Sequence, residues 1–174
     1  MPSAELTAES IPLRRQPVDV GVLVELTTEI MQIQAKTLGV TLSIHVDDDV
    51  PDVVFIDRDK VAWAITSLLG SALRHARTPG GVIALHVGYD ACASTLRVSV
   101  RDDGPGISSE QLQRLLQRDK WHPGSALALL LVQDIASAHG GTMEIESRVD
   151  RESHFTKVVF TIPAPGSVAQ ATHG

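Results

Sequence analysis

This sequence of 174 residues contains few cysteine and aromatic residues and has no excess of basic residues. The single cysteine, Cys92, excludes an internal disulfide and fits a reducing compartment. Aromatic residues make up 3% of the chain against 43% hydrophobic residues, so the core must be mainly aliphatic. The formal charge of −6 argues against a nucleic-acid partner, because such domains usually carry a basic stripe.

Several other sequence signals are absent, and each absence removes a class of protein. No apolar run reaches the roughly 20 residues of a membrane span, and no signal peptide is visible, so we expect a soluble, cytoplasmic chain without membrane insertion. There is no phosphate-binding Gly-x-x-x-x-Gly-Lys-Ser/Thr motif and no nucleophile elbow. No histidine pair four residues apart has a carboxylate partner, so a metal-hydrolase site is not expected, and the acidic triplet at 47–49 is interpreted as a solvated turn.

Hydrophobic periodicity predicts one domain over residues 17–163, with an N-terminal arm at 1–16 and a disordered tail at 164–174. Helical spacing of apolar residues predicts helices at 20–38, 57–77, 108–117 and 126–139. Alternation and short apolar runs predict strands at 40–46, 53–56, 82–89, 95–101, 142–149 and 155–162. This order predicts an α/β (α+β) two-layer sandwich, in which a mixed, mostly antiparallel sheet is covered on one face by about three helices.

The turn Asp-Asp-Gly-Pro-Gly-Ile at 102–107 is the main candidate for a ligand site. Asp102 follows the strand at 95–101, which would hold its carboxylate on a fixed backbone. Gly104 and Gly106 permit left-handed or crowded conformations and the close approach of a flat ligand. The same residues also make ordinary hairpin turns, so this segment alone does not establish a site.

Four segments in order resemble the ATP-binding catalytic domain of bacterial sensor histidine kinases, within the superfamily that includes gyrase, Hsp90 and MutL. The predicted helix at 57–77 resembles the asparagine box, Asn-Leu-Leu-x-Asn-Ala. Residues 102–107 match the first glycine box, Asp-x-Gly-x-Gly-Ile, and residues 124–129 stand at the second, Gly-x-Gly-Leu-Gly-Leu. Ala-His-Gly-Gly at 138–141 typically follows that box. The resemblance covers residues 17–163 and implies the Bergerat-type fold.

The resemblance implies bound ATP and Mg²⁺, and it gives roles to individual residues. Asp102 would accept a hydrogen bond from the adenine amino group. Arg74 would reach phosphate oxygens, and His75 would pack on the nucleotide. The helix after Gly124 would offer its free N–H groups to the phosphates. The implied nucleotide-binding residues are Asp102, Gly104, Gly106, Ile107, Ser71, Arg74, His75, Gly124, Ser125, Ala126 and Leu127, with Ser71 also a weak Mg²⁺ ligand and no catalytic residue assigned.

Some motif positions depart from the family pattern. Ser67 and Ser71 replace the two asparagines, and a serine hydroxyl is too short to reach Mg²⁺ without an intervening water. Ala126 and Ala128 replace glycines of the second box, and each added methyl group crowds the phosphate approach. The segment between the boxes, which corresponds to the ATP lid, is short and lacks the usual phenylalanine box.

Three hypotheses follow from the sequence. The first is a histidine-kinase catalytic domain that supplies the γ-phosphate of ATP to a histidine on a separate dimerisation domain, which would lie before Met1, in a pathway with a response regulator. The second is a degenerate, nucleotide-free module that docks a response regulator or another protein. The third is an anti-sigma-type serine kinase, which fits Ala-His-Gly-Gly less well. His139 is interpreted as a helix-end hydrogen bonder, where a cation is favoured.

Overall fold

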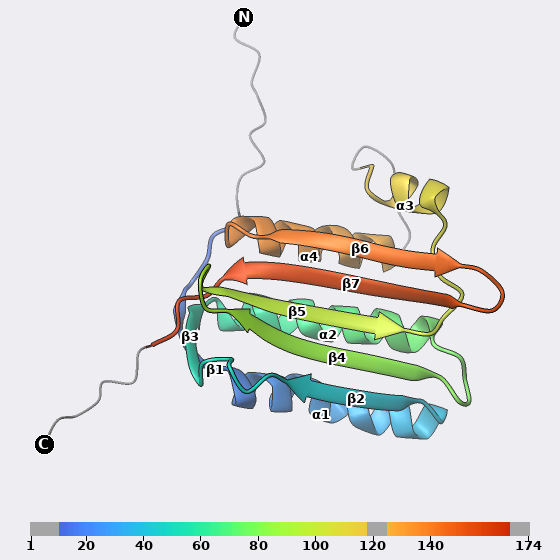
Figure 1. Ribbon diagram of the computed structural model, residues 1–174, viewed down its shortest axis with the longest axis horizontal. Helices are drawn as coiled ribbons and strands as arrows, with labels where there is room; N and C mark the ends of the chain where they lie inside the picture. The colour runs from blue at the N-terminus through green and yellow to red at the C-terminus, as the bar shows by residue number, and fades with distance from the viewer. Residues whose placement is uncertain (1–10, 118–124, 168–174) are drawn as a thin grey trace, which may run out of the picture.

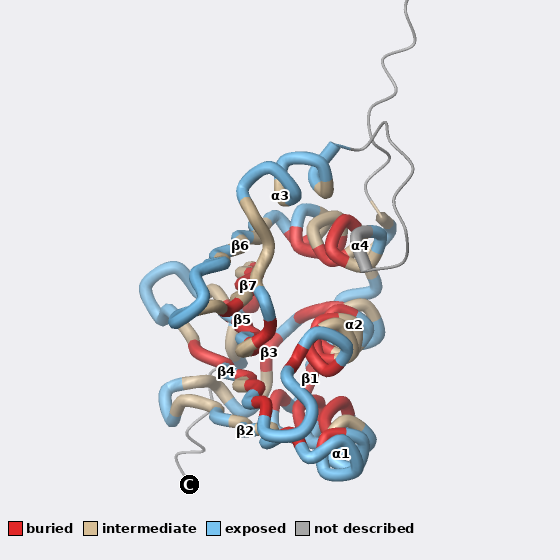
Figure 2. The backbone as a smooth tube through the Cα atoms, turned by 90° about the vertical axis from the view of Figure 1, so that its right-hand side faces the viewer, coloured by how far each residue is buried: buried red, intermediate tan, exposed pale blue. Residues whose placement is uncertain are grey.

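The computed structural model describes residues 11–117 and 125–167 (Figure 1). The elements are β1 (Gln16–Asp19), α1 (Val20–Leu38), β2 (Thr41–Val46), β3 (Val53–Ile56), α2 (Arg58–His75), β4 (Val82–Asp90), β5 (Thr95–Asp102), α3 (Ser109–Leu115), α4 (Ser125–Ala138), β6 (Thr142–Val149) and β7 (His154–Pro163). Five strands form the main sheet in the order β2-β4-β5-β7-β6, and α1, α2 and α4 cover one of its faces (Figure 2). The predicted two-layer α/β sandwich is confirmed.

The strand β3 does not join the main sheet, although the sequence interpretation placed all strands in one sheet. It pairs antiparallel with β1 in a separate two-stranded sheet, in which Val18 lies opposite Val54. The prediction placed no strand at residues 16–19, because a four-residue segment containing Pro17 is a weak strand signal. Pairing between distant segments therefore decided this part of the fold. In the main sheet only β2 and β4 run parallel; the remaining pairs are antiparallel.

The apolar face predicted for α2 is confirmed, and it forms the centre of the core. Asp57 caps this helix by accepting a hydrogen bond from the Lys60 N–H at 3.1 Å. The side chains of its inner face are all buried: Val61, Ala64, Ile65, Leu68, Leu69 and Ala72. On α1 the apolar set divides instead, because this helix lies at the edge of its layer and is covered on one side (Figure 2). Its exposed apolar residues are Val22, Leu26, Ile30, Ile33 and Leu38.

The ordered chain continues past residue 163, so the predicted start of the tail is too early. Ala164 is fully buried, and its carbonyl oxygen accepts a hydrogen bond from the Tyr89 hydroxyl at 2.9 Å. Gly166 forms an isolated bridge with Val54 of β3. These contacts close the small sheet against the main one. The rest of the predicted tail, 168–174, and residues 1–10 of the predicted arm lie outside the described residues.

The neutral imidazole ring of His139 joins the end of α4 to the start of α2 through hydrogen bonds. Its side chain is 2% exposed, Nδ1 lies 2.8 Å from the Ile135 carbonyl oxygen, and Nε2 lies 3.2 Å from the Asp57 N–H. The backbone N–H can only donate, so Nε2 must keep its lone pair and Nδ1 carries the proton. The hydrogen-bonding role expected for His139 is thus present, but the expected cation is not. Burial lowers the pKa of His139.

The lowered pKa predicts a pH-dependent contribution of His139 to stability. An unfolded histidine takes up a proton below about pH 6.5, whereas the native ring takes it up only at lower pH. The unfolded state therefore binds more protons in this window, so the contribution is complete above the unfolded pKa and is lost as the pH falls through the window. Because one proton is involved, the free energy of unfolding changes by at most about 1.4 kcal/mol per pH unit.

His139→Gln keeps a donor and an acceptor but cannot titrate at these pH values. We expect urea unfolding between pH 8 and pH 5 to show a shallower pH dependence in the variant than in the parent below about pH 6.5. Parallel stability curves for the two proteins would show that His139 does not titrate with folding.

No helix among the described residues is both long and apolar enough to cross a lipid bilayer.

Candidate functional site

A cavity of about 480 Å³ lies between α2, the end of β5, the turn that follows β5, and α3. Its size is that of a pocket for a small organic ligand, and its walls are mainly apolar. The residues that line it are Leu68, Ser71, Ala72, His75, Val100, Asp102, Pro105, Gly106, Ile107, Gln111, Arg114, Leu115, Leu129, Thr156 and Val158. The structure therefore brings five residues of the sequence prediction, Ser71, His75, Asp102, Gly106 and Ile107, to one cavity.

Asp102 contributes a buried carboxylate to this cavity. It is the last residue of β5, where it lies opposite Ile83 of β4 and Thr156 of β7, and it is 7% exposed. Its Oδ1 accepts a hydrogen bond from the Gly104 N–H at 2.8 Å. Burial raises the pKa of Asp102, and the hydrogen bond from Gly104 opposes this shift. A carboxylate with little contact with water in an apolar pocket strongly favours a ligand that donates a hydrogen bond to it.

The two glycines of the turn serve the packing of the protein itself. A Cβ on Gly104 would lie 2.5 Å from the carbonyl oxygen of His75, at the end of α2. Gly106 has a left-handed φ of 79°, and a Cβ there would collide with the carbonyl oxygen of Arg148 on β6. The crowded, left-handed backbone that we expected is present. The missing Cβ atoms admit neighbouring backbone, whereas the sequence interpretation assigned that space to a ligand; Gly106 nevertheless lines the cavity.

Hydrogen bonds hold the same turn against the β6–β7 hairpin. The Ile107 N–H donates to the Ser147 hydroxyl oxygen at 2.6 Å, and that hydroxyl donates to the Phe155 carbonyl oxygen at 2.9 Å. The Nδ1 of His154 lies 2.6 Å from the Gly104 carbonyl oxygen. One wall of the cavity is therefore fixed by the fold before any ligand arrives.

Other predicted site residues lie away from this cavity or outside the described side chains. Arg74 is exposed and does not line the cavity, whereas His75 does, with Nδ1 2.8 Å from the Ser71 carbonyl oxygen. Leu127 is 54% exposed and also lies off the lining. Gly124 is outside the described residues, and so are the side chains of Ser125 and Ala126, although α4 begins at Ser125.

Several lining residues were not found from the sequence. Thr156 lies opposite Asp102 across β5 and β7, and Val158 follows two residues later on the same face. Gln111 and Arg114 are three residues apart on α3, and both reach the cavity wall. The alternation of β7 and the spacing on α3 were visible in the sequence, but only the tertiary arrangement shows that both elements face Asp102.

The two-layer sandwich carries a pocket beside a strand-end carboxylate, an arrangement that can hold a small ligand with a hydrogen-bond donor. Residues 56–166 match the family of histidine kinase-, DNA gyrase B-, and HSP90-like ATPases, and the chain belongs to that family. Within the family it corresponds to the ATP-binding catalytic domain of a sensor histidine kinase.

Similar proteins include histidine protein kinase DivJ of Caulobacter vibrioides, which is 31% identical over 155 residues, 84% of this chain and 25% of DivJ. The adaptive-response sensory kinase SasA of Synechococcus sp. strain JA-3-3Ab is 34% identical over 140 residues, 75% of this chain and 36% of SasA. This chain thus spans about a quarter to a third of these relatives.

Among solved structures, full-length ShkA in complex with AMPPNP aligns with a TM-score of 0.78 at 22% identity, over 92% of this chain and 33% of ShkA. The catalytic domain of histidine kinase ThkA in a nucleotide-free form aligns with a TM-score of 0.73 at 20% identity, over 87% of this chain and 97% of that domain. These likenesses support the fold.

Proposed function

We propose that this chain binds Mg²⁺-ATP and presents the γ-phosphate to a histidine on a separate dimerisation domain. The phosphoryl group would then pass from that histidine to a response regulator. The observation that carries the proposal is the buried carboxylate of Asp102 in the apolar cavity. A sensor kinase module of this kind would work in the cytoplasm, where ATP is available. The chain covers only part of its relatives, so the acceptor histidine is expected on another segment or chain.

The cavity fits an adenine ring. The carboxylate of Asp102 would accept a hydrogen bond from the exocyclic amino group, whereas guanine presents a carbonyl oxygen at the equivalent position and would repel it. The apolar side chains of Val100, Val158 and Leu129 offer surfaces for the ring faces. The pocket therefore favours adenine over guanine nucleotides.

The phosphate end of the site is less completely defined by the described residues. Arg114 is a cation on the cavity wall, and the first N–H groups of α4 have no partner within their helix. Ser71 would hold Mg²⁺ through a water molecule, since its hydroxyl is shorter than an asparagine side chain. Bound Mg²⁺ would neutralise phosphate charge. The protein's own contribution to phosphoryl transfer would be positioning and charge stabilisation.

A labelling experiment with ATP carrying radioactive γ-phosphate tests the proposal. The chain alone should acquire no label, because its acceptor is elsewhere. A fusion in which this chain replaces the matching part of Caulobacter DivJ should acquire an acid-labile label, and the same fusion with Asp102→Asn should lose it. Intact DivJ is the positive control. Acid-labile label on the isolated chain, or no label on the fusion while intact DivJ is labelled, would contradict the proposal.

The competing hypothesis of a nucleotide-free docking module predicts different behaviour. It rests on the serines at 67 and 71 and the alanines at 126 and 128. Under that hypothesis Asp102→Asn would change no activity of the fusion, and ATP would not bind. Acid-stable phosphate on a protein serine would instead favour the serine kinase hypothesis.

A further inference from the structure

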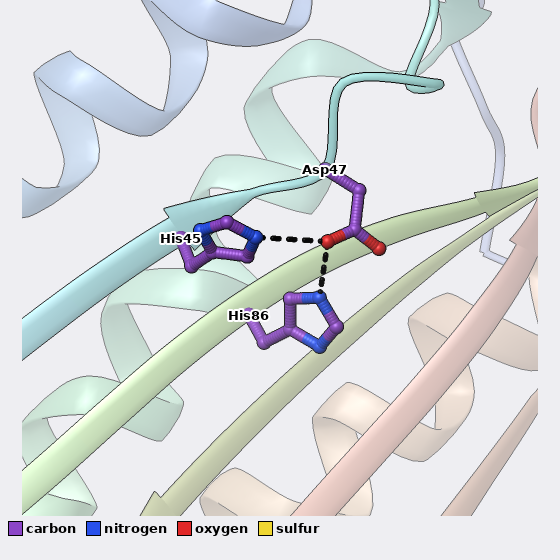
Figure 3. Close-up of side chains that lie close together, drawn as sticks. All are labelled: His45, Asp47 and His86. Carbon is purple, nitrogen blue, oxygen red and sulfur yellow. Dashed lines mark hydrogen bonds and ion pairs between the residues drawn. The ribbon is translucent and has the colours of Figure 1, made fainter.

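Two histidines and an aspartate meet on the outer face of the main sheet, away from the nucleotide pocket (Figure 3). The Nε2 of His86 lies 2.7 Å from Asp47 Oδ1, and the Nε2 of His45 lies 3.1 Å from the same oxygen. The two imidazole rings stack, with centroids 5.5 Å apart. All three side chains thus direct one potential metal ligand atom to a common point.

Strand register explains why these residues meet. His45 and His86 are direct partners in the parallel pair β2–β4, so their side chains leave the same face of the sheet. The neighbouring Leu85 is buried, which places the histidines on the face opposite the helices. Asp47 follows His45 by two residues, and its N–H donates to the Val87 carbonyl oxygen at 2.9 Å, so its position at the end of β2 is fixed by the backbone.

Gly88 provides the space that the carboxylate occupies. It follows His86 by two residues on β4 and therefore faces the same side of the sheet. A Cβ at Gly88 would lie 3.0 Å from Asp47 Oδ2, closer than ordinary van der Waals contact. The pairing of two strands therefore positions the three side chains, and the absence of a side chain at Gly88 leaves space for the carboxylate.

We propose that His45, Asp47 and His86 form a binding site for one divalent transition-metal ion of the Zn²⁺ class. Two imidazole nitrogens and one carboxylate oxygen are a ligand set that Zn²⁺ accepts, and these three atoms lie within 4.8 Å of one another. Imidazole ligands disfavour Mg²⁺ and Ca²⁺, which require oxygen.

The exposure of the site determines how coordination would be completed. The side chains of His45, His86 and Asp47 are 72%, 48% and 36% exposed, so a fourth position is open to water or to a ligand from another molecule. A bound ion would cross-link the edge strand β2 to β4 and stabilise the native state by mass action.

Calorimetric titration of Zn²⁺ into the metal-free chain at pH 7.5 tests this site. The titration uses a Cys92→Ser background, because an exposed thiol also binds zinc. We expect one Zn²⁺ per chain, with at least about tenfold weaker binding after His86→Ala or Asp47→Asn. Asp48→Asn is the matched control, since it removes the same charge from the same turn and should bind as the parent does.

A thermal melt gives an independent readout with the same variants. Zinc should raise the unfolding temperature of the parent and of Asp48→Asn, and it should leave His86→Ala unchanged; Mg²⁺ should have no such effect through these residues. Equal zinc affinity in the parent and both cluster variants, or no uptake at millimolar zinc, would overturn the proposal and leave the three side chains with hydrogen bonding alone.

Discussion

Asp102→Asn should remove most of the affinity for ATP while leaving the protein folded. The asparagine oxygen can still accept from the Gly104 N–H, so its amide NH₂ would face the adenine amino group, and two donors would then oppose each other. Loss of a charged hydrogen bond of this kind costs about 1.5–3 kcal/mol, or roughly 10- to 150-fold in the dissociation constant. Calorimetric titration with ATP measures the change directly.

Asp103→Asn is a matched control. It removes the same charge from the neighbouring residue, and Asp103 does not line the cavity. Stability separates a binding defect from unfolding. The raised pKa of Asp102 shows that its charge is disfavoured in the native state, so removing that charge should leave the free energy of unfolding equal or higher at pH 7. Unchanged ATP affinity in Asp102→Asn, or equal losses in both variants, would contradict the assigned role.

Gly106→Ala should destabilise the protein far more than Gly80→Ala. Both glycines have a left-handed φ, 79° and 93°, which costs an alanine about 1–2 kcal/mol. At Gly80 nothing lies within 4 Å of the added Cβ, whereas at Gly106 the methyl group meets the Arg148 carbonyl oxygen. We therefore expect a loss of about 3 kcal/mol or more for Gly106→Ala and about 1–2 kcal/mol for Gly80→Ala.

Urea unfolding of the two glycine variants measures this difference. The displaced turn of Gly106→Ala should also weaken ATP binding, since Gly106 and Ile107 form part of the cavity wall. Equal destabilisation of the two variants would mean that the turn after β5 is not packed against β6 as described.

Local patterns predicted the elements well, and pairing between distant segments was the main source of error. The inner face of α2 follows from helical spacing, and the sandwich follows from the order of elements. The separate β1–β3 sheet depends on a contact between segments about 40 residues apart, and the parallel β2–β4 pair on a crossover through α2. Neither register is encoded in local alternation.

In the candidate site, too, local sequence predicted some residues, whereas tertiary contacts decided others. Asp102 was predicted because a strand end and a glycine turn are adjacent in sequence. The role of Arg74 at the phosphates stays a prediction: Ser71 and His75, four residues apart on α2, line the cavity, whereas their neighbour Arg74 does not. Thr156 and Arg114 reach the cavity from other elements and were missed.

The histidine–aspartate cluster was missed for a related reason. Asp47 was interpreted as part of a solvated turn, and metal ligands were sought at the spacing of a single helix. Strand register between β2 and β4 brings His45 and His86 together across about 40 residues of sequence.

Calorimetric titration of the purified parent chain with ATP and ADP, with and without Mg²⁺ and with GTP as control, tests the central claim most directly. The buried carboxylate predicts binding of both adenine nucleotides in the micromolar range and no comparable binding of GTP. Absence of binding at millimolar ATP, or equal binding of ATP and GTP, would contradict a catalytic module that selects adenine through Asp102.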